Sequence, residues 1–181
     1  MNDQLSVLKL VTGRLDAAAI PYMITGSIAI GHYARPRMTR DIDLVVELQE
    51  PDADRIATMF SDQFDCDAAA IRTSIVRQSL FNLIHTEAIV KVDVIIRKNA
   101  PYRLEEFARR RQVTIEGHRV WIVSAEDLIL SKLLWAKDAR SELQLNDVRQ
   151  LISSQPGLDW PYLDRWAATL GVSELLREMR S

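Results

Sequence analysis

Hydrophobic residues recur with two different periods along the chain. Helical spacing predicts an amphipathic helix over residues 3–20, which Pro21 ends. Between residues 22 and 123, short apolar and alternating runs predict strands with helices between them, whereas helical spacing dominates residues 124–181. The pattern predicts an α/β (α+β) fold in which helices flank a mixed β-sheet and further helices follow it.

The same pattern gives approximate bounds for each element. The expected strands are residues 22–24, 41–48, 79–85, 88–97, 112–116 and 119–123. The expected helices after the first are residues 28–33, 51–64, 67–78, 101–111, 124–139, 142–153, 160–169 and 173–180. Short turns predict two hairpins among the later strands. We expect a core with its N-terminal helix at 1–123 and a C-terminal helical subdomain at 124–181 that packs on it.

The composition is that of an ordinary globular protein. The chain has 181 residues, of which 48% are hydrophobic and 27% charged. Its net charge of −2 argues against a surface that binds nucleic acid non-specifically. The N-terminus lacks the features of a signal peptide, and no apolar run has the length of a membrane span. We expect a cytoplasmic protein with no membrane contact, in which the single cysteine, Cys66, is a small buried hydrophobic residue.

Two aspartates one residue apart carry the first chemical signal. Asp41 and Asp43 begin an expected strand, and residues two apart on a strand point to the same side. Two carboxylates held this close repel each other unless a cation lies between them. Mg²⁺ suits this place, because it prefers oxygen ligands and keeps coordination positions for substrate phosphates. An Asp-x-Asp pair alone is common at strand ends, where both acids are solvated, so the interpretation depends on the residues around it.

Two neighbouring features strengthen the metal interpretation. Gly26 and Ser27 follow an apolar strand and open an expected helix, whose first backbone N–H groups form a ready site for phosphate. Asp93 lies in the middle of the apolar strand 88–97, where a carboxylate without a partner is costly to bury. The sequence therefore predicts three carboxylates around a metal ion, beside a turn that holds phosphate.

These residues resemble a known family signature. The nucleotidyltransferase superfamily that shares its fold with DNA polymerase beta carries a Gly-Ser pair, then Asp-hydrophobic-Asp, then a third carboxylate on a later strand. This chain is similar to it at Gly26-Ser27, Asp41-Ile42-Asp43 and Asp93. Other segments look most like the abortive-infection type nucleotidyltransferase toxins and their minimal relatives. These segments are residues 37–44, 81–85, 91–94 and 126–133, within a resemblance that covers about residues 20–155.

The resemblance implies a Mg²⁺- or Mn²⁺-dependent nucleotidyltransferase. Such an enzyme transfers a nucleoside monophosphate from a nucleoside triphosphate, such as ATP, to a hydroxyl and releases pyrophosphate. Asp41, Asp43 and Asp93 would bind the metal ions, and Asp93 would also help to take the proton from the acceptor hydroxyl. The residues expected to bind the nucleotide are Gly26, Ser27, Arg37, Thr39 and Arg40. A loop-capping role would explain Thr39 equally well.

The C-terminal part of the resemblance adds two lysines. It assigns Lys132 to catalysis and Lys137 to the nucleotide, with Asp147 as a further candidate. The toxin branch has a compact Arg-x-Lys-Asp-x-x-Asp cluster, whereas the corresponding residues here are separated. Lys132 could instead extend its ammonium to water with its stem on the core. An ion pair within a helix or plain exposure would also explain Lys137 and Asp147.

The acceptor and the biological role stay open at this stage. The toxin branch implies an RNA or tRNA end as acceptor, and a protein side chain or a small molecule is also compatible. A non-catalytic nucleotide- or RNA-binding module, or a partner subunit of a toxin–antitoxin pair, is the alternative function. An active toxin would have a cognate antitoxin as its partner, and we expect a monomer or a homodimer.

Other conspicuous residues are expected to be structural. We interpret Arg109–Arg111 as the solvated C-terminal end of a helix, where cations are favoured. His85 is expected to pack at a strand end, and neither it nor His32 has partners at zinc-ligand spacing. The tryptophans are expected to pack in the core and between helices rather than to stack on bases. They are Trp121, Trp135, Trp160 and Trp166.

Overall fold

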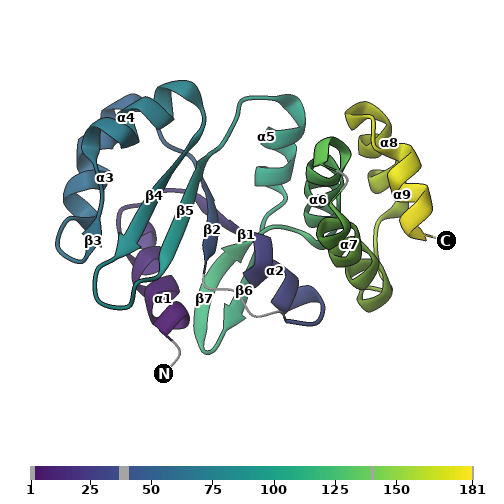
Figure 1. The fold of residues 1–181 in the computed structure, drawn as a ribbon, viewed down its shortest axis with the longest axis horizontal. Helices are drawn as coiled ribbons and strands as arrows, with labels where there is room; N and C mark the ends of the chain where they lie inside the picture. Colours follow the sequence, from purple (N-terminus) through teal and green to yellow (C-terminus); the bar gives the residue numbers. More distant parts are fainter. Residues whose placement is uncertain (1–2, 37–40, 140, 181) are drawn as a thin grey trace.

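The computed structural model describes residues 3–36, 41–139 and 141–180, which contain a seven-stranded mixed sheet (Figure 1). The strand order is β3-β4-β5-β2-β1-β7-β6. The strands are β1 (Tyr22–Thr25), β2 (Ile42–Val46), β3 (Phe64–Asp65), β4 (Leu80–His85), β5 (Lys91–Ile96), β6 (Arg111–Ile115) and β7 (His118–Ile122). The first helices are α1 (Asp3–Ala17), α2 (Gly26–Tyr33), the 3-10 turn η1 (Glu50–Asp52), α3 (Ala53–Phe60), α4 (Ala68–Arg77) and α5 (Pro101–Ala108). The C-terminal helices are α6 (Ala125–Ala139), α7 (Glu142–Ser154), α8 (Trp160–Leu170) and α9 (Ser173–Arg180).

The predicted fold class is confirmed, and the element bounds agree within a few residues. Both predicted hairpins are present, since β4 pairs antiparallel with β5 and β6 with β7. The two-residue strand β3 is too short to leave a periodic pattern, so the sequence did not predict it. The helix expected at 101–111 ends at Ala108, because the chain turns there and Arg111 begins β6.

The two faces of the sheet differ in burial. On β2 the side chains of Ile42, Leu44 and Val46 are at most 1% exposed, and Phe81 and Leu83 of β4 are also buried. The side chains between them point to the opposite face, because direction alternates along a strand. That opposite face carries the polar residues, so the catalytic candidates and the main apolar core lie on different sides of the sheet.

Helices α1, α3 and α4 lie together in the sheet-bearing part of the molecule. Arg14 of α1 donates to the carbonyl of Met59 in α3 (2.6 Å) and forms an ion pair with Asp62 (2.7 Å). A second contact joins the same two helices, since Arg55 of α3 donates to the carbonyl of Ala18, just after α1 (2.6 Å). Helix α4 contacts both α3 and β4. Their apolar sides complete the core cluster that contains the buried face of the sheet.

The C-terminal helices α6–α9 form a separate layer at the side of the sheet where α2 and α5 lie (Figure 1). Helix α6 is central to this layer, since it contacts α7, α8 and α9 as well as α2. The side chains of Ile129, Leu130 and Leu133 on α6 are completely buried. The position and tilt of α6 therefore determine which of its side chains reach the polar face of the sheet.

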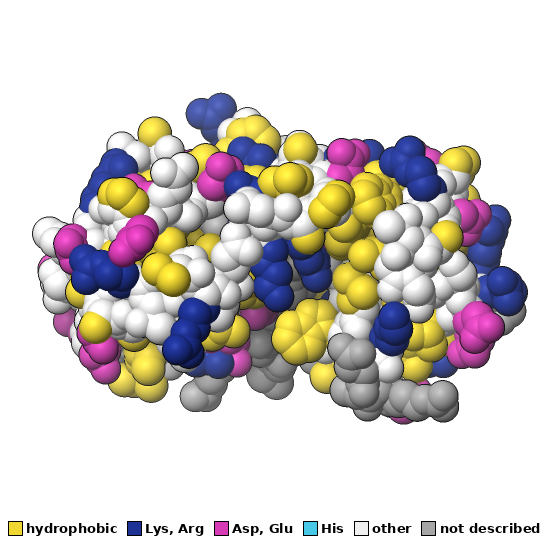
Figure 2. Space-filling view, turned by 90° about the horizontal axis from the view of Figure 1, so that it is seen from above, with side chains coloured by type: hydrophobic (Ala, Val, Ile, Leu, Met, Phe, Trp, Pro, Cys, Tyr) yellow, Lys and Arg dark blue, Asp and Glu magenta, His cyan; other side chains and the backbone are white. Residues whose placement is uncertain are grey.

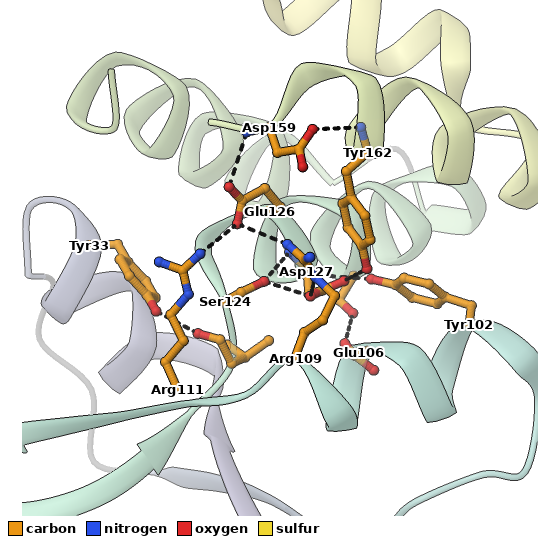
Figure 3. Close-up of polar contacts among 12 residues, drawn as sticks. Tyr33, Tyr102, Glu106, Arg109, Arg111, Ser124, Glu126, Asp127, Asp159 and Tyr162 are labelled. Atoms are coloured by element: carbon orange, nitrogen blue, oxygen red, sulfur yellow. Dashed lines mark hydrogen bonds and ion pairs between the residues drawn. The ribbon is translucent and has the colours of Figure 1, made fainter. Parts of the chain in front are cut away.

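A buried polar network fixes the start of α6 (Figure 3). The carboxylate of Asp127, which is 0% exposed, accepts hydrogen bonds from Ser124 Oγ (2.6 Å), Arg109 Nε (3.2 Å) and the hydroxyl of Tyr162 (2.5 Å). The Arg109 guanidinium also lies over the Tyr162 ring, 3.8 Å from its centroid. Because Arg109 follows α5 and Tyr162 belongs to α8, Asp127 connects three parts of the fold.

The adjacent acid extends the same network to α8. Glu126 Oε1 accepts a hydrogen bond from the backbone N–H of Asp159 (3.1 Å), the residue before α8, and its other oxygen lies 3.8 Å from Arg111 Nη2. Asp159 in turn accepts from the backbone N–H of Tyr162 (3.0 Å) and so caps the helix. The two acids that mark the start of α6 in the sequence therefore also position α8.

The prediction of a solvated helix end at Arg109–Arg111 is wrong. Arg109 pairs with Asp127, Arg110 lies over the rings of Phe107 (4.4 Å) and Trp121 (5.0 Å), and Arg111 reaches the carboxylate of the first turn of α6. Apart from Phe107, three residues before Arg110, these partners come from α6 and β7, so no local pattern identifies them.

Substitution Asp127→Ala tests the network. It leaves the Arg109 guanidinium without its closest carboxylate, and we expect the free energy of unfolding to fall by about 3–5 kcal/mol, as for other broken buried pairs. Asp164→Ala is the matched control, because the ion pair described for Asp164, with Arg180 (3.8 Å), is exposed, and its loss should change stability by less than about 1 kcal/mol. Urea denaturation measures both; equal effects of the two substitutions would contradict the structural role of Asp127.

Candidate active site

The register of the central strands brings the predicted acids together. Strand β2 runs parallel to β5, and Asp43 is directly opposite Asp93. Asp41 immediately precedes β2 and lies two residues before Asp43, on the same side of the chain. The Asp93 side chain is 20% exposed and that of Asp41 51% exposed. The sheet therefore presents three carboxylates on its polar face, from two adjacent strands.

Burial and mutual repulsion act on the central acid. Burial raises the pKa of the Asp43 carboxyl above its ordinary value, and the negative charges of Asp93 and Asp41 raise it further. The nearby ammonium groups of Lys132 and Lys91 oppose this rise in the pKa of Asp43. Positive charge at this place would keep Asp43 ionised.

Lys91 supplies part of that positive charge. Its ammonium lies 3.1 Å from Asp93 Oδ2 and 3.6 Å from Asp41 Oδ2. The hydrogen bond to Asp93 is the main reason that the pKa of Lys91 lies above its ordinary value. The ammonium thus stands between two of the carboxylates, where a divalent cation would be expected to bind.

Gly26 is required by both backbone conformation and space. Its φ of +62° lies in the left-handed region that side chains other than glycine rarely adopt. A Cβ at this position would also lie 2.6 Å from Cγ of Asp43 and even closer to Oδ2. The missing side chain therefore lets the start of α2 approach the Asp43 carboxylate.

The N-terminus of α2 opens beside the acids. No side chain caps this end of the helix among the contacts that the structure describes for Thr25. The Ser27 side chain is 7% exposed, and its Oγ has no hydrogen-bond partner among the described residues. An orphaned buried hydroxyl at a helix N-terminus is suited to an anionic group such as phosphate.

A pocket of about 380 Å³ lies between Asp41 and Asp43 on one side and α6 and α7 on the other. One wall is formed by the start of α2 and by Asp41 and Asp43, and the opposite wall by one side of α6. The α6 residues are spaced three or four apart and so share one side of the helix. They are Leu128, Ser131, Lys132 and Trp135.

Lys132 reaches the pocket as part of a buried ion pair. Its ammonium lies 2.7 Å from Asp147 Oδ2 and donates to Gln144 Oε1 (2.9 Å), both in α7. Lys132 and Asp147 are 5% and 2% exposed. The alternative in which the ammonium extends to water is therefore not what the structure shows. The pair fixes the ammonium opposite Asp41 and Asp43, where it opposes the rise in the pKa of Asp43.

Some predicted residues lie elsewhere. The Lys137 ammonium donates to the carbonyl of Leu170 (3.3 Å) and lines a different hollow, of about 530 Å³, between α6, α7 and α9. The structure therefore does not bring Lys137 to the carboxylates. Arg37, Thr39 and Arg40 lie outside the described residues.

Sequence reasoning missed several polar or aromatic residues at the acids or in the pocket, among them Lys91, Gln144 and Trp135. Lys91 lies on the same face as Asp93 at i−2, a spacing that could have identified it. Gln144 enters only through the packing of α7 on α6. Trp135 is 66% exposed at the pocket, so the prediction that all four tryptophans pack in the core or between helices is wrong for it.

The predictions for His85 and Cys66 have different outcomes. His85 ends β4, packs edge-to-face against Phe64 and accepts from the backbone N–H of Ala88 (3.0 Å), as predicted for a strand end. Cys66 is only partly buried, although it contacts the core. In the helices that the structure describes, none combines the length and the hydrophobicity needed to cross a membrane.

The chemistry of the three acids fits a hard divalent cation. Their donors are all carboxylate oxygens, and Asp93 Oδ1 is buried without a hydrogen-bond partner among the described residues. No cluster of three or more acidic, histidine or cysteine side chains in the described part converges as a ready metal shell. The Lys91 ammonium would have to move aside for a cation to contact Asp41 and Asp93 together.

Solved structures share this architecture. The chain superposes on a nucleotidyltransferase-like antigenic protein from Paracoccidioides brasiliensis with a TM-score of 0.60 and 19% identity, over 98% of this chain and 93% of the other. The lincosamide antibiotic adenylyltransferase LnuA, bound to lincomycin, gives 0.54 and 12%, over 82% and 94%. ANT(2″)-Ia in complex with adenylyl-2″-tobramycin gives 0.55 and 16%, over 94% and 98%. These likenesses show that the chain has a nucleotidyltransferase-like fold.

Sequence comparison adds nothing to the structural likeness. No family model matches the chain, and no curated protein matches it at a significant level.

Substitution Gly26→Ala tests the close approach of α2 to Asp43. The left-handed φ and the overlap with the carboxylate should lower the free energy of unfolding by more than about 1–2 kcal/mol. Gly13→Ala is the control, because a Cβ there meets nothing within 4 Å and Gly13 lies inside α1. It should stabilise the protein by about 0.5–1 kcal/mol. Denaturant unfolding measures both, and an equally stable Gly26→Ala protein would contradict the assignment.

Proposed function

We propose that this chain is a metal-dependent nucleotidyltransferase that transfers a nucleoside monophosphate from a nucleoside triphosphate to a hydroxyl acceptor. The observation that carries the proposal is the pairing of Asp43 with Asp93 directly beside the glycine-permitted start of α2. This arrangement places paired carboxylates next to an open helix N-terminus, which are the two requirements for holding a metal-bound triphosphate.

The order of the strands gives each residue a role. Across the sheet, β1 leads into Gly26 and Ser27, β2 carries Asp43 with Asp41 directly before it, and β5 carries Asp93. The β- and γ-phosphates would lie at Ser27 and the Lys132 ammonium, and the α-phosphate beside Asp43. The acceptor oxygen would then approach from the side of Asp93, opposite to the leaving pyrophosphate.

The transfer step follows from this order. The acceptor hydroxyl oxygen forms a bond to the α-phosphorus, the bond from that phosphorus to the bridging oxygen breaks, and pyrophosphate leaves with the electron pair. Asp93, whose Oδ1 has no described partner, accepts the hydroxyl proton. Divalent ions bound by Asp41, Asp43 and Asp93 would neutralise the charge that develops on the attacking and leaving oxygens.

The surface beyond Asp93 favours a small-molecule acceptor. Strand β4 lies next to β5, and Asn82 is paired directly with Asp93. Leu80 and Ile84, two residues to either side of Asn82, are 48% and 38% exposed. This strip carries no charged side chain, whereas RNA binding depends on cations placed along the phosphate backbone. The similar LnuA and ANT(2″)-Ia structures contain lincomycin and an adenylylated tobramycin.

An RNA end remains the second acceptor, since the resemblance to toxins implies it. Arg37 and Arg40 of the toxin-like segment, close to Asp41 in the sequence, would contribute positive charge for an RNA. A toxin with an RNA acceptor would slow growth when expressed alone, and its cognate antitoxin would relieve the effect.

Substitution Asp43→Asn tests the enzyme. With α-labelled nucleoside triphosphates, Mg²⁺ and a panel of hydroxylated small molecules, total RNA and protein, we expect label on one acceptor class with the native chain. Loss of the central carboxylate should reduce transfer at least about 100-fold. Asp164→Asn, on the exposed side of α8, is the control and should keep full activity. Unchanged transfer by Asp43→Asn would refute the mechanism. Nucleotide binding with no transfer to any acceptor would instead favour the non-catalytic binding module.

Substitution Lys91→Met tests whether the ammonium occupies the cation's place. Removal of a positive charge 3.1 Å from Asp93 and 3.6 Å from Asp41 should tighten Mn²⁺ binding, by about tenfold or more, because the ion no longer competes with the lysine. Calorimetric titration with Mn²⁺ measures the affinity. Lys9→Met is the control, since the Lys9 ammonium donates to the carbonyl of Glu116, in the turn between β6 and β7. Weaker Mn²⁺ binding by Lys91→Met would show that Lys91 supports the metal site instead.

A further inference from the structure

A second hollow, of about 170 Å³, opens directly from the pocket of the acids. The two share part of their lining: Thr25, Ile95, Ser131 and Trp135. Figure 2 looks onto the molecule from above and shows Lys and Arg side chains gathered in a hollow between the two halves, with hydrophobic side chains at its edge. The shared residues make one continuous groove, whose acidic part is the site described above.

The floor of the second hollow is apolar and lies two residues along the strands from Asp43 and Asp93. Val45 of β2 and Ile95 of β5 are paired with each other, two residues beyond the pair of Asp43 and Asp93 and on the same face. Two residues of a strand span about 7 Å. A group bound over Val45 and Ile95 would therefore be separated from a phosphate at Asp43 by roughly the width of a sugar.

Trp135 forms part of the wall of both hollows. It follows Lys132 by three residues and so projects from the same side of α6. Its side chain is 66% exposed, although a tryptophan usually buries most of its large apolar surface. The described part of the chain leaves this ring uncovered at the mouth of the groove, where a planar ligand could cover it.

The polar lining of the second hollow supplies mainly hydrogen-bond donors. Glu106, which is 4% exposed, is already paired, since it accepts from Ser131 Oγ (2.5 Å) and from Arg103 Nη1 (2.7 Å). Arg103 keeps further N–H groups at the hollow, and Arg97 and Lys98 lie beside it. Carbonyl oxygens and ring nitrogens of a heterocycle would find donors here.

We propose that this second hollow binds the nucleobase of the donor nucleotide, with Trp135 stacked on the base above Val45 and Ile95. The inference rests on the proposed function for the position of the triphosphate. The β- and γ-phosphates point toward Ser27 and the acceptor lies toward Asp93, so both lie across the strands from the α-phosphate. The sugar and base would therefore extend from the α-phosphate along the strands. The hollow at Val45 and Ile95 lies in that direction, and base–aromatic stacking suits the exposed ring.

The test compares a nucleotide with its phosphate part alone. Binding of each of the four ribonucleoside triphosphates and of inorganic tripolyphosphate, all with Mg²⁺, is measured by calorimetry on the full chain. Trp135→Ala should weaken the binding of the triphosphate that the native chain prefers by about tenfold or more, and leave tripolyphosphate binding unchanged. Trp135→Phe should restore most of the affinity, since it keeps an aromatic face.

Trp160→Phe is the matched control, because Trp160 lies under the Arg180 guanidinium (4.1 Å) at the start of α8 and should change neither affinity. Unchanged nucleotide binding by Trp135→Ala would overturn the proposal, as would an equal loss for nucleotide and tripolyphosphate. A native chain that binds neither compound would refute the proposed function itself, and a native chain that binds both equally would refute only the base site.

Discussion

The site depends on one constraint, the parallel pairing of β2 with β5, which holds Asp43 opposite Asp93. Carboxylates on adjacent strands repel each other, and burial makes the charged form of Asp43 less favourable still. The backbone hydrogen bonds of the sheet and the apolar packing on its other face hold them together regardless. Such enforced repulsion creates a place where positive charge is strongly favoured, and Lys91 and Lys132 supply it from two sides.

Every other part of the site depends on how closely the neighbouring elements approach these acids. Helix α2 comes near Asp43 only because residue 26 is glycine. Helix α6 presents Lys132 from the opposite side, and the pair with Asp147 keeps that ammonium from turning to water. A buried charge of this kind adds little net stability, because desolvation offsets much of the Coulomb attraction. Its value lies in fixing the position of the ammonium.

The polar network around Asp127 fixes the start of α6, the helix that carries Lys132 and Trp135. Asp127 and Glu126 bind the beginning of α6 to Arg109 after α5 and to the beginning of α8 (Figure 3). A rotation of α6 about its axis would break these contacts at one end. At the other end, the same rotation would move Lys132 and Trp135 along the groove. The polar contacts therefore fix the geometry of a site to which they contribute no atom.

The sequence by itself determined the mixed sheet, the C-terminal helices and the three acids. Each of these depends on a local signal: apolar periodicity for the elements, the i, i+2 rule for Asp41 and Asp43, and a lone acid within an apolar strand for Asp93. Only the tertiary structure decided that Lys132 faces the acids while Lys137 lies against α9, and that Trp135 is exposed. These outcomes depend on the rotation and packing of whole helices, and the contacts that set them join residues far apart in the chain. A single sequence contains no local signal for such contacts.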